Sequence, residues 1–155
     1  MIAEFEGKYA FLSNFYHSPI TYDGITYPTN EHFFQAMKTL DQEERKAIAA
    51  APTPGKAKRM GRHVALRSDW EEIKVDVMRT GLMLKFTDGN LASKLIATGD
   101  EELIEGNTWH DNAWGSCMCM KCINIPGRNM LGMLLMELRK GLIYGDVASN
   151  EMAHF

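Results

Sequence analysis

The sequence predicts an α+β fold: a mainly helical single domain, residues 1–155, with a small antiparallel β-sheet. Two observations lead to this prediction. Apolar residues recur at helical spacing in the second half of the chain, and two short β-type runs flank an Asp-Gly pair near the N-terminus. With 155 residues and 45% hydrophobic content, the chain is long enough for one domain with a core and short for two.

The antiparallel sheet is expected near the N-terminus. In PITYDGITYP, isoleucine and tyrosine alternate with other residues on both sides of Asp23-Gly24. Such alternation is typical of strands, and an Asp-Gly pair tolerates the positive φ angles that a two-residue hairpin turn requires. This stretch therefore predicts a β-hairpin.

Three short helices are expected to follow the hairpin. Pro28 cannot lie inside a helix, whereas Thr29 or Asn30 can cap one that begins near Glu31 in the stretch EHFFQAMK. The second helix fits DQEERKAIAAA, which APTP closes. The third begins after Pro54 and runs through KAKRMGRH.

The second half of the chain contains the clearest helical patterns. In SDWEEIKVDVMRTGLMLKF, Ser68 and Glu71 form a capping box, and apolar residues recur at helical spacing until TDGN breaks the pattern. LASKLIAT predicts a short helix that Gly99 ends, and LIEGNTW predicts a brief strand before a long loop. NMLGMLLMELRKGL predicts a closing helix with Asn129 as its cap and leucines along one face at positions 131, 134, 135, 138 and 142.

Charge and composition restrict the classes of function. Lys and Arg total 17 while Asp and Glu total 20, so the net charge of −3 provides no overall attraction for nucleic acid or anionic membranes. No apolar run approaches the ~20 residues of a membrane span, and the start MIAEFEGKYAF lacks a basic segment followed by an apolar one. We expect a soluble, cytoplasmic protein that holds any anionic ligand through a local cluster of cations.

Two carboxylates are candidates for chemistry. Glu31 directly follows a proline turn, and His32 beside it projects about 100° away around the helix, so the two side chains need not act together. Glu31 can serve a cleft, or it can simply stabilise the helix N-terminus while His32 packs against a neighbour. Asp111 lies in a loop between Trp109 and Trp114, and these tryptophans can either stack a flat ring or anchor the loop to the core.

Positive charge is concentrated in the stretch KAKRMGRHVALR. On a helix, Lys58 and Arg59 each lie within about one turn of Arg62, so this side can hold a phosphate or form a solvated basic face. Lys38 and Lys85 lie beside aromatic residues in the sequence and are weaker candidates of the same kind.

All three cysteines, Cys117, Cys119 and Cys122, lie in the single segment SCMCMKC. An odd number in one segment is not the pattern of a secreted disulfide protein, so reduced thiols in a partly buried loop are the default. His110 lies seven residues before the first cysteine, which makes a zinc site of three cysteines and one histidine the alternative. Structural zinc sites use paired CxxC arms, however, and the sequence contains only one such arm.

Several motifs, taken together and in order, resemble those of a known family. They are FLSNFY at 11–16, YPTNEHFFQAMK at 27–38, AKRMGR at 57–62, DWEEIKVDVM at 69–78, LKF at 84–86, LIATGDEELIE at 95–105, and WG followed by GRNMLGMLLMELR at 127–139. Over nearly its whole length the sequence is similar to the NADAR family, the YbiA-like N-glycosidases. The SCMCMKC insert occurs in only part of that family, which bears on substrate identity and on metal binding.

The resemblance implies a compact α+β domain that cleaves N-glycosidic bonds to ribose that bears phosphate. It implies two classes of substrate: phosphoribosylamino-pyrimidine intermediates of riboflavin synthesis, and ADP-ribose attached to guanine in nucleic acid. Glu31 in TNEH matches the family's catalytic glutamate, while Trp70 in DWE and Asp111 in DNAWG match its other functional positions. The substrate-binding residues expected on the same basis are Asn14, Phe15, Lys38, Lys58, Arg62, Arg67 and Trp114.

The chemistry of such a reaction agrees with this assignment. Cleavage of a ribosyl C–N bond builds positive charge on the sugar, so the carboxylate of Glu31 can stabilise that charge and orient water, with Asp111 in support. Trp70 and Trp114 would stack the base or shape its slot, while the basic residues would hold phosphate. Such hydrolysis requires no metal and no other cofactor, and nothing in the sequence indicates an obligate protein partner or a membrane.

The alternative is a non-catalytic module that binds ADP-ribose or a related nucleotide through the same residues. The joint presence of Glu31, Trp70 and Asp111 favours the enzyme, because binding alone has less need of an acid that faces the scissile bond. The expected partner is a small ribosyl-phosphate molecule or ADP-ribosylated nucleic acid. The acidic balance of the chain favours the smaller ligand over long duplex.

Overall fold

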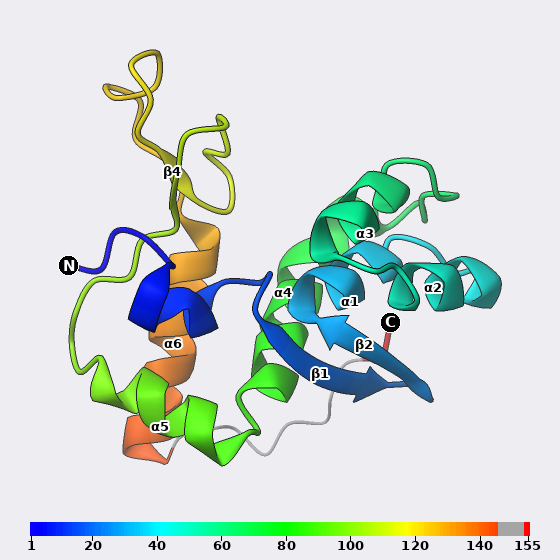
Figure 1. The fold of residues 1–155 in the computed structure, drawn as a ribbon, viewed down its shortest axis with the longest axis horizontal. Coiled ribbons are helices and arrows are strands. Elements are labelled where there is room, and N and C mark those ends of the chain that lie inside the picture. The colour runs from blue at the N-terminus through cyan, green and yellow to red at the C-terminus, as the bar shows by residue number, and fades with distance from the viewer. Residues whose placement is uncertain (146–153) are drawn as a thin grey trace. The chain divides into compact units, whose positions relative to one another are not determined.

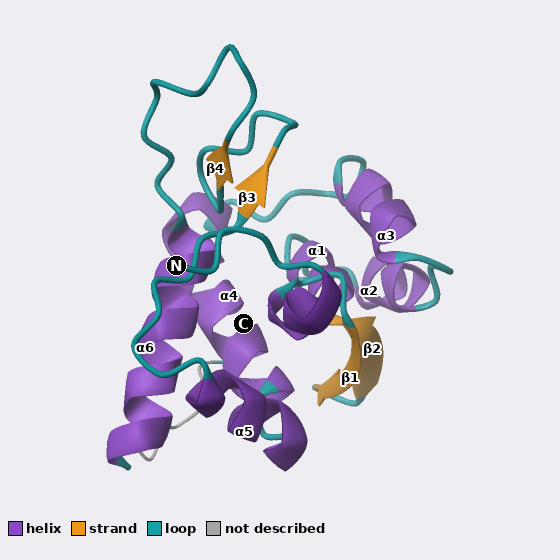
Figure 2. Cartoon of the chain, turned by 60° about the vertical axis from the view of Figure 1, so that its left-hand side comes forward, coloured by secondary structure: helices purple, strands orange, loops and turns teal. Residues whose placement is uncertain are grey.

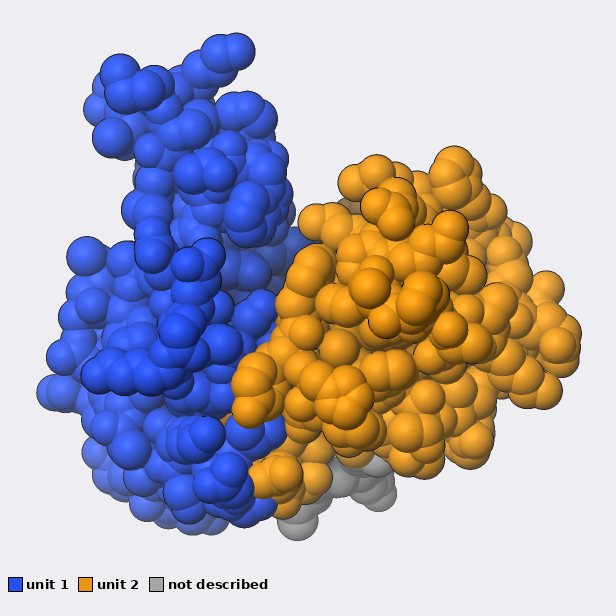
Figure 3. Space-filling view, in the orientation of Figure 1, with its two compact units in different colours: residues 1–13, 89–149 blue, residues 14–88, 150–155 orange. Residues whose placement is uncertain are grey.

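The computed structural model describes residues 1–145 and 154–155, and the contacts divide the chain into two compact units. Unit 1 contains residues 1–13 and 89–149, and unit 2 contains residues 14–88 and 150–155 (Figure 3). Seven helices and two small sheets make up the described part, so the predicted α+β fold, mainly helical with a small antiparallel sheet, is confirmed. That the 155 residues form a single domain stays a prediction.

Unit 2 begins with the predicted hairpin. Strand β1 (His17–Tyr22) pairs antiparallel with β2 (Ile25–Thr29), and both are labelled in Figure 1. Asp23 and Gly24 have φ angles of 50° and 79°, which is the pair of positive angles that a tight hairpin turn needs. Because side chains alternate along a strand, Ile20 and Tyr22 are buried on one face of β1.

Four helices complete the described core of unit 2: α1 (Asn30–Ala36), α2 (Gln42–Ala49), α3 (Pro54–Gly61) and α4 (Trp70–Lys85). Each of the first three has a capping side chain, from Thr29, Asp41 and Thr53 respectively, that accepts a hydrogen bond from the first turn. Helix α1 packs against α2, α3, α4 and β2, so it lies at the centre of the unit. Its Phe33 is fully buried and packs edge-on against Tyr22 and Tyr27 of the hairpin.

The capping box predicted for α4 is wrong. The helix begins at Trp70, its N-cap is Asp69, and no side-chain cap hydrogen bond is made there. The carboxylate of Asp69 instead accepts hydrogen bonds from Nε and Nη2 of Arg67, at 2.7 and 3.2 Å. The ion pair fixes the turn before the helix, so Ser68 lies one residue too early to cap it.

Unit 1 contains the 3₁₀ helix η1 (Gly7–Leu12), the helices α5 (Gly89–Ala97) and α6 (Met130–Tyr144), and two short strands. Strand β3 (Gly106–Asn107) pairs in parallel with β4 (Ser116–Cys117), as Figure 2 shows. The first residues of the chain join this unit because Ile2 and Leu103 form a parallel bridge. The N-terminal 3₁₀ helix has no clear signal in the sequence.

The two predicted helices of unit 1 are confirmed, with one correction. Helix α5 packs against α6, and Gly99 follows α5 with a φ of 64°. The predicted leucine face of α6 is buried at positions 131, 134 and 135 and half-buried at 138 and 142. Asn129 precedes α6 but does not cap it, because its side chain donates to the carbonyl of Leu103 and accepts from the N–H of Glu105.

No helix within residues 1–145 has both the length and the apolar character that crossing a membrane requires.

Candidate active site

The central residue of the candidate site is Glu31, which lies in the first turn of α1 and is 7% exposed. Its Oε1 accepts a hydrogen bond from Nε2 of Gln35, one helical turn later, at 2.9 Å. Its backbone N–H donates to the carbonyl of Asn14 at 3.1 Å. Because burial of a carboxylate is costly without donors, the Gln35 bond both stabilises Glu31 and fixes the direction in which its carboxylate points.

Asn14 holds the start of the hairpin against α1. Its side-chain oxygen accepts a hydrogen bond from Nδ2 of Asn30 at 2.8 Å, and both amide nitrogens lie 3.5 Å from the sulfur of Met78 in α4. Asn14 and Asn30 are both buried. The two asparagines therefore link the chain segments on either side of the hairpin and support the backbone next to Glu31. The predicted substrate-binding residue Phe15, beside them, is 47% exposed.

His32 has a structural role in this arrangement. Its Nδ1 lies 2.7 Å from Oγ1 of Thr29, and its Nε2 lies 3.0 Å from the carbonyl of Ala51. A carbonyl only accepts, so the neutral ring with its proton on Nε2 satisfies both contacts. Burial lowers the pKa of His32 below its ordinary 6.5. The structural interpretation of His32 is therefore confirmed: both of its ring nitrogens contact Thr29 and Ala51, and neither contacts Glu31.

Three cations accompany Glu31 in unit 2: Lys38, Lys58 of α3, and Arg62, the C-cap residue that follows α3. Burial lowers the pKa of Lys38, the Glu31 carboxylate opposes this shift, and the positive charges of Lys58 and Arg62 add to it. Interactions of this kind require that Glu31, Lys58 and Arg62 each lie near Lys38. One carboxylate and three cations give a local charge of about +2 in a chain whose net charge is −3.

Trp70 lies beside this group but is buried, with 6% of its surface exposed. Its ring packs edge-on against Phe34 of α1 at a centroid distance of 5.0 Å, and Nζ of Lys38 lies 6.0 Å from the ring centroid. Arg67 is also largely buried and is held by Asp69, whose pKa its hydrogen bonds lower. Trp70 thus supports Lys38, and Arg67 fixes the turn that precedes Trp70.

Lys85 lies apart from these cations. It is 1% exposed, and its Nζ lies 5.6 and 5.4 Å from the ring centroids of Tyr16 and Phe86. Burial lowers the pKa of Lys85 to about 7. Lys85 therefore belongs to the buried core of unit 2.

Asp111 and Trp114 belong to unit 1, where Asp111 closes its own loop. Oδ1 of Asp111 accepts from the N–H groups of Ala113 and Trp114 at 3.1 and 2.9 Å. The backbone of Asp111 is held in turn by the side chain of Asn107 in β3, through bonds of 2.8 and 3.1 Å. Trp114 is half-buried, whereas Trp109 is 61% exposed. Asp111 therefore shapes the loop that carries Trp114.

The structure brings Glu31, Lys58 and Arg62 each close to Lys38, as their electrostatic effects on that lysine require. Sequence reasoning missed Gln35 and Gly61, which complete the setting of Glu31. A Cβ on Gly61 would lie 2.0 Å from Oε1 of Gln35, so only glycine leaves room for the amide that holds the carboxylate. The i, i+4 spacing of Glu31 and Gln35 on a helix was the signal that could have identified the pair.

This arrangement suits one kind of chemistry. A carboxylate fixed by a donor can stabilise a cation that forms next to it, and the flanking lysines and arginine can bind an anionic group on the same ligand. The residues gathered here therefore fit a ligand that carries both a phosphate and a centre that becomes positive.

Comparisons with known proteins identify the family. The NADAR domain model matches residues 3–143. N-glycosidase YbiA of Shigella boydii is 44% identical over 137 residues, which cover 86% of this chain and 82% of that protein. A riboflavin biosynthesis protein of Vibrio vulnificus is 37% identical over 138 residues, 87% of this chain and 36% of that protein. The NMR structure of YbiA from Escherichia coli has a TM-score of 0.79 and 38% identity, over 99% of this chain and 92% of that chain.

The names of these relatives agree with the enzyme class that the sequence motifs imply, and the solved structure agrees with the fold. The match extends over both units, because residues 3–143 include β1, β2, α1 to α5 and nearly all of α6. From the motifs, the fold and these matches together, we conclude that the chain belongs to the NADAR family.

Proposed function

We propose that the chain is an N-glycosidase that hydrolyses the bond between C1′ of a phosphorylated ribose and the nitrogen of a base. The observation that carries this proposal is the setting of Glu31: a buried carboxylate, held by Gln35, with Lys38 close by and Lys58 and Arg62 close to Lys38. The relatives named N-glycosidase support the same reaction type.

In the proposed reaction, the C1′–N bond breaks and its electron pair goes to the nitrogen of the base, which leaves positive charge on C1′ and the ring oxygen. The carboxylate of Glu31 stabilises this charge. A water molecule then forms the new C1′–O bond, and Glu31 accepts the proton that the water loses. The departing base gains a proton from solvent, and Glu31 then releases the proton that it accepted. The net reaction consumes one water, and the products are the free base and ribose phosphate.

The cations have a separate task in this proposal. Lys58 and Arg62 bind the phosphate on the ribose, Arg62 through two parallel N–H donors. Lys38 lies close enough to Glu31 for the two charges to interact, and its Nζ lies 6.0 Å from the centroid of the Trp70 ring. Phosphate binding positions C1′ in front of the carboxylate. Asp111 and Trp114 are proposed as supporting residues for the leaving base, on the strength of their match to the family's motif.

Two substrate classes compete. The name of the Vibrio relative favours a phosphoribosylamino-pyrimidine of riboflavin synthesis. ADP-ribose attached to guanine contains the same bond type and supplies two phosphates to the cations. A cluster of three cations in a chain of net charge −3 favours the small molecule, because long nucleic acid would meet overall repulsion.

Product analysis tests the proposal. The wild-type chain is incubated separately with a phosphoribosylamino-pyrimidine and with ADP-ribosyl-guanine in short DNA, and the products are identified by mass spectrometry. Release of ribose phosphate and free pyrimidine is the expected result. Release of ADP-ribose would retain the reaction and change the substrate, whereas no release from either substrate would overturn the proposal.

A nucleotide-binding module without catalysis is the second candidate, because the same cations would bind ADP-ribose. Such a module would raise its melting temperature with ligand and release no product. The Gln35 bond to the buried Glu31 carboxylate favours the enzyme, since a phosphate-binding module gains nothing from a fixed negative charge beside its cations.

A further inference from the structure

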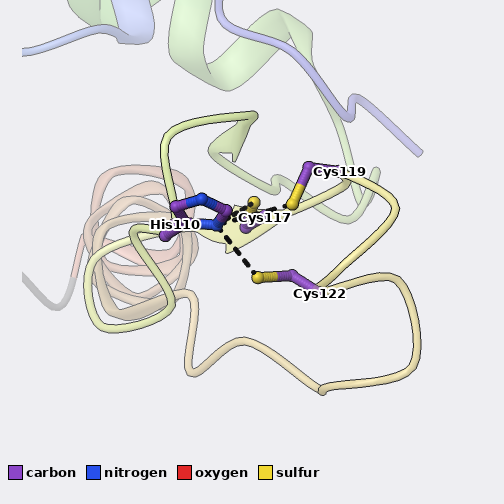
Figure 4. A group of neighbouring side chains, drawn as sticks. All are labelled: His110, Cys117, Cys119 and Cys122. Carbon is purple, nitrogen blue, oxygen red and sulfur yellow. Dashed lines mark hydrogen bonds between the residues drawn. The ribbon is translucent and has the colours of Figure 1, made fainter.

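The cysteine loop of unit 1 brings four metal-binding side chains to one point. The Sγ atoms of Cys117, Cys119 and Cys122 and the ring of His110 offer ligand atoms that all lie within 4.8 Å of one another. Figure 4 shows the three sulfurs gathered around one nitrogen of the imidazole. From Nδ1 of His110 the distances are 3.3 Å to Cys122, 3.4 Å to Cys119 and 3.8 Å to Cys117.

These distances agree with a tetrahedral metal site. Zn²⁺ binds sulfur at about 2.3 Å and nitrogen at about 2.0–2.1 Å, which separates each sulfur from the nitrogen by about 3.6 Å and the sulfurs from one another by about 3.8 Å. The observed nitrogen–sulfur distances span this value. Hydrogen bonding alone does not account for the arrangement, because one ring nitrogen has a single proton or a single lone pair to share among three sulfurs.

The fold supplies the second ligand arm that is absent from the sequence pattern. Cys119 and Cys122 form a CxxC arm, closed by a hydrogen bond of 3.0 Å from the N–H of Cys122 to the carbonyl of Cys119. Cys117 lies in β4, and the parallel pairing of β4 with β3 places it opposite Asn107, whose side chain holds the turn that carries His110. His110 and Cys117 therefore form the other arm.

The loop also lacks the apolar packing that would otherwise hold it. Between Cys117 and Gly127, the side chains of Met118, Met120, Ile123 and Ile125 are all exposed, Met120 by 90%. His110 has a φ of 69°, in the left-handed region that costs a non-glycine residue about 1 kcal/mol or more. A segment with little buried apolar surface and a strained ligand residue gains most of its order from a crosslink.

We infer that His110, Cys117, Cys119 and Cys122 form a structural zinc site in this chain. Four protein ligands leave no open position, which distinguishes a structural site from a catalytic one. Three thiolates and a neutral imidazole are a soft, tetrahedral ligand set that selects zinc over magnesium or calcium. Binding converts three thiols to thiolates and releases their protons to solvent, which leaves the site with a net charge of −1.

The site has a consequence for the neighbouring residues. Asp111 and Trp114 lie between His110 and Cys117 in the sequence, so the metal closes the loop that contains both. Zinc would fix this loop without taking part in the hydrolysis. We expect that the hydrolysis itself needs no metal, and a structural zinc in this loop is compatible with that expectation.

Metal analysis tests this inference independently of any activity. The wild-type chain, produced with zinc in the medium and purified without a metal-affinity step, should contain about one zinc per chain by mass spectrometry of the element. Cobalt titrated into the metal-free chain should give the visible bands of a tetrahedral ion and the near-ultraviolet band of thiolate ligation. The variants Cys119→Ser and His110→Ala should lose these bands or bind cobalt much more weakly.

Matched controls separate loss of ligands from loss of fold. Met120→Ser changes an exposed residue between two of the ligands, and His63→Ala removes an exposed histidine of unit 2, so both should retain one metal per chain. Circular dichroism of each variant should show unchanged helix content. A wild-type chain that contains no zinc and binds no cobalt would overturn the inference, as would an intact mass that lacks two hydrogens and so reveals a disulfide.

Discussion

Gly61 makes room for the side chain that holds Glu31. In Gly61→Ala, the new methyl group would lie 2.0 Å from Oε1 of Gln35, so the amide must rotate and its bond to Glu31 is lost. A hydrogen bond to a charged group contributes about 1.5–3 kcal/mol, so we predict that kcat falls at least about tenfold. Gly55→Ala is the control on the same helix, because its nearest contact would be an ordinary 3.9 Å. Equal rates for the two variants would contradict this role.

His32 makes stability depend on pH. Its pKa in the folded chain is below 6.5, so the unfolded chain binds a proton first as pH falls, and the free energy of unfolding decreases below about pH 6.5. We predict that His32→Gln flattens this part of the curve between about pH 7.5 and about pH 5.5 in urea titrations. His63→Gln, at an exposed position, should leave the wild-type slope unchanged. A wild-type slope in His32→Gln would show that another group titrates.

Arg62 should act on binding more than on the chemical step. We predict that Arg62→Gln raises KM about tenfold and leaves kcat within about threefold, because in the proposed reaction the arginine binds the phosphate and does not contact the reacting bond. Arg59→Gln is the control: Arg59 lies in α3 three residues before Arg62, both arginines are exposed, and Arg59 is not among the charges that act on Lys38. A fall in kcat with unchanged KM in Arg62→Gln would contradict the assignment.

At the level of elements, α3 carries Lys58, places Arg62 directly after its last residue, and depends on its N-terminal cap. Oγ1 of Thr53 accepts from the N–H of Lys56 at 3.0 Å, and Thr53→Ala should lower the free energy of unfolding by about 1 kcal/mol. Ser68→Ala is the matched test at α4, where no side-chain cap bond is made, and should change stability by less than about 0.5 kcal/mol. Denaturant titration measures both. If Ser68→Ala lowered the free energy of unfolding more than Thr53→Ala, Ser68 would be a cap of α4 after all, which would contradict the structure.

The elements that the sequence predicts well are those with local causes. The hairpin follows from Asp23-Gly24, and α1 follows from Pro28 and the cap at Thr29, because each signal acts within a few residues. The start of α4 was wrong because the Arg67–Asp69 ion pair, which a capping-box pattern does not include, competes with it. Strand β3 lies inside the stretch LIEGNTW, for which a brief strand is predicted. Its parallel partner β4, about ten residues later, has only two residues and carries no pattern of its own.

At the scale of the whole molecule, the two candidate sites belong to different units of the chain. Unit 2 contains the carboxylate and its cations, and unit 1 contains the ligand cluster around His110. Each unit consists of two segments that are far apart in the sequence. Unit 1 in particular needs Ile2, whose N–H donates to Glu102 and whose carbonyl accepts from Ile104. Such long-range pairing carries no local signal, so the sequence does not predict it.

The candidate site shows the same limit. Glu31, Lys58 and Arg62 were predicted from motifs and helical spacing, and the structure brings them together with Lys38. Gln35 was missed because its importance depends on the space that Gly61 leaves, a contact across two helices. The roles of Asp111 and Trp114 in the reaction stay predictions. The hydrogen bonds of Asp111 to its own loop explain its place there on structural grounds alone.

The central claim is that the carboxylate of Glu31 performs the hydrolysis, and one comparison tests it most directly. Product release and the dissociation constant are measured for wild type, Glu31→Gln and Glu43→Gln on the N-riboside that the wild type cleaves. Glu43 is the control because it is an exposed glutamate near the start of α2. The account predicts that Glu31→Gln loses about two to four orders of magnitude in kcat and binds within about tenfold of wild type, while Glu43→Gln behaves as wild type. Wild-type turnover by Glu31→Gln would contradict it.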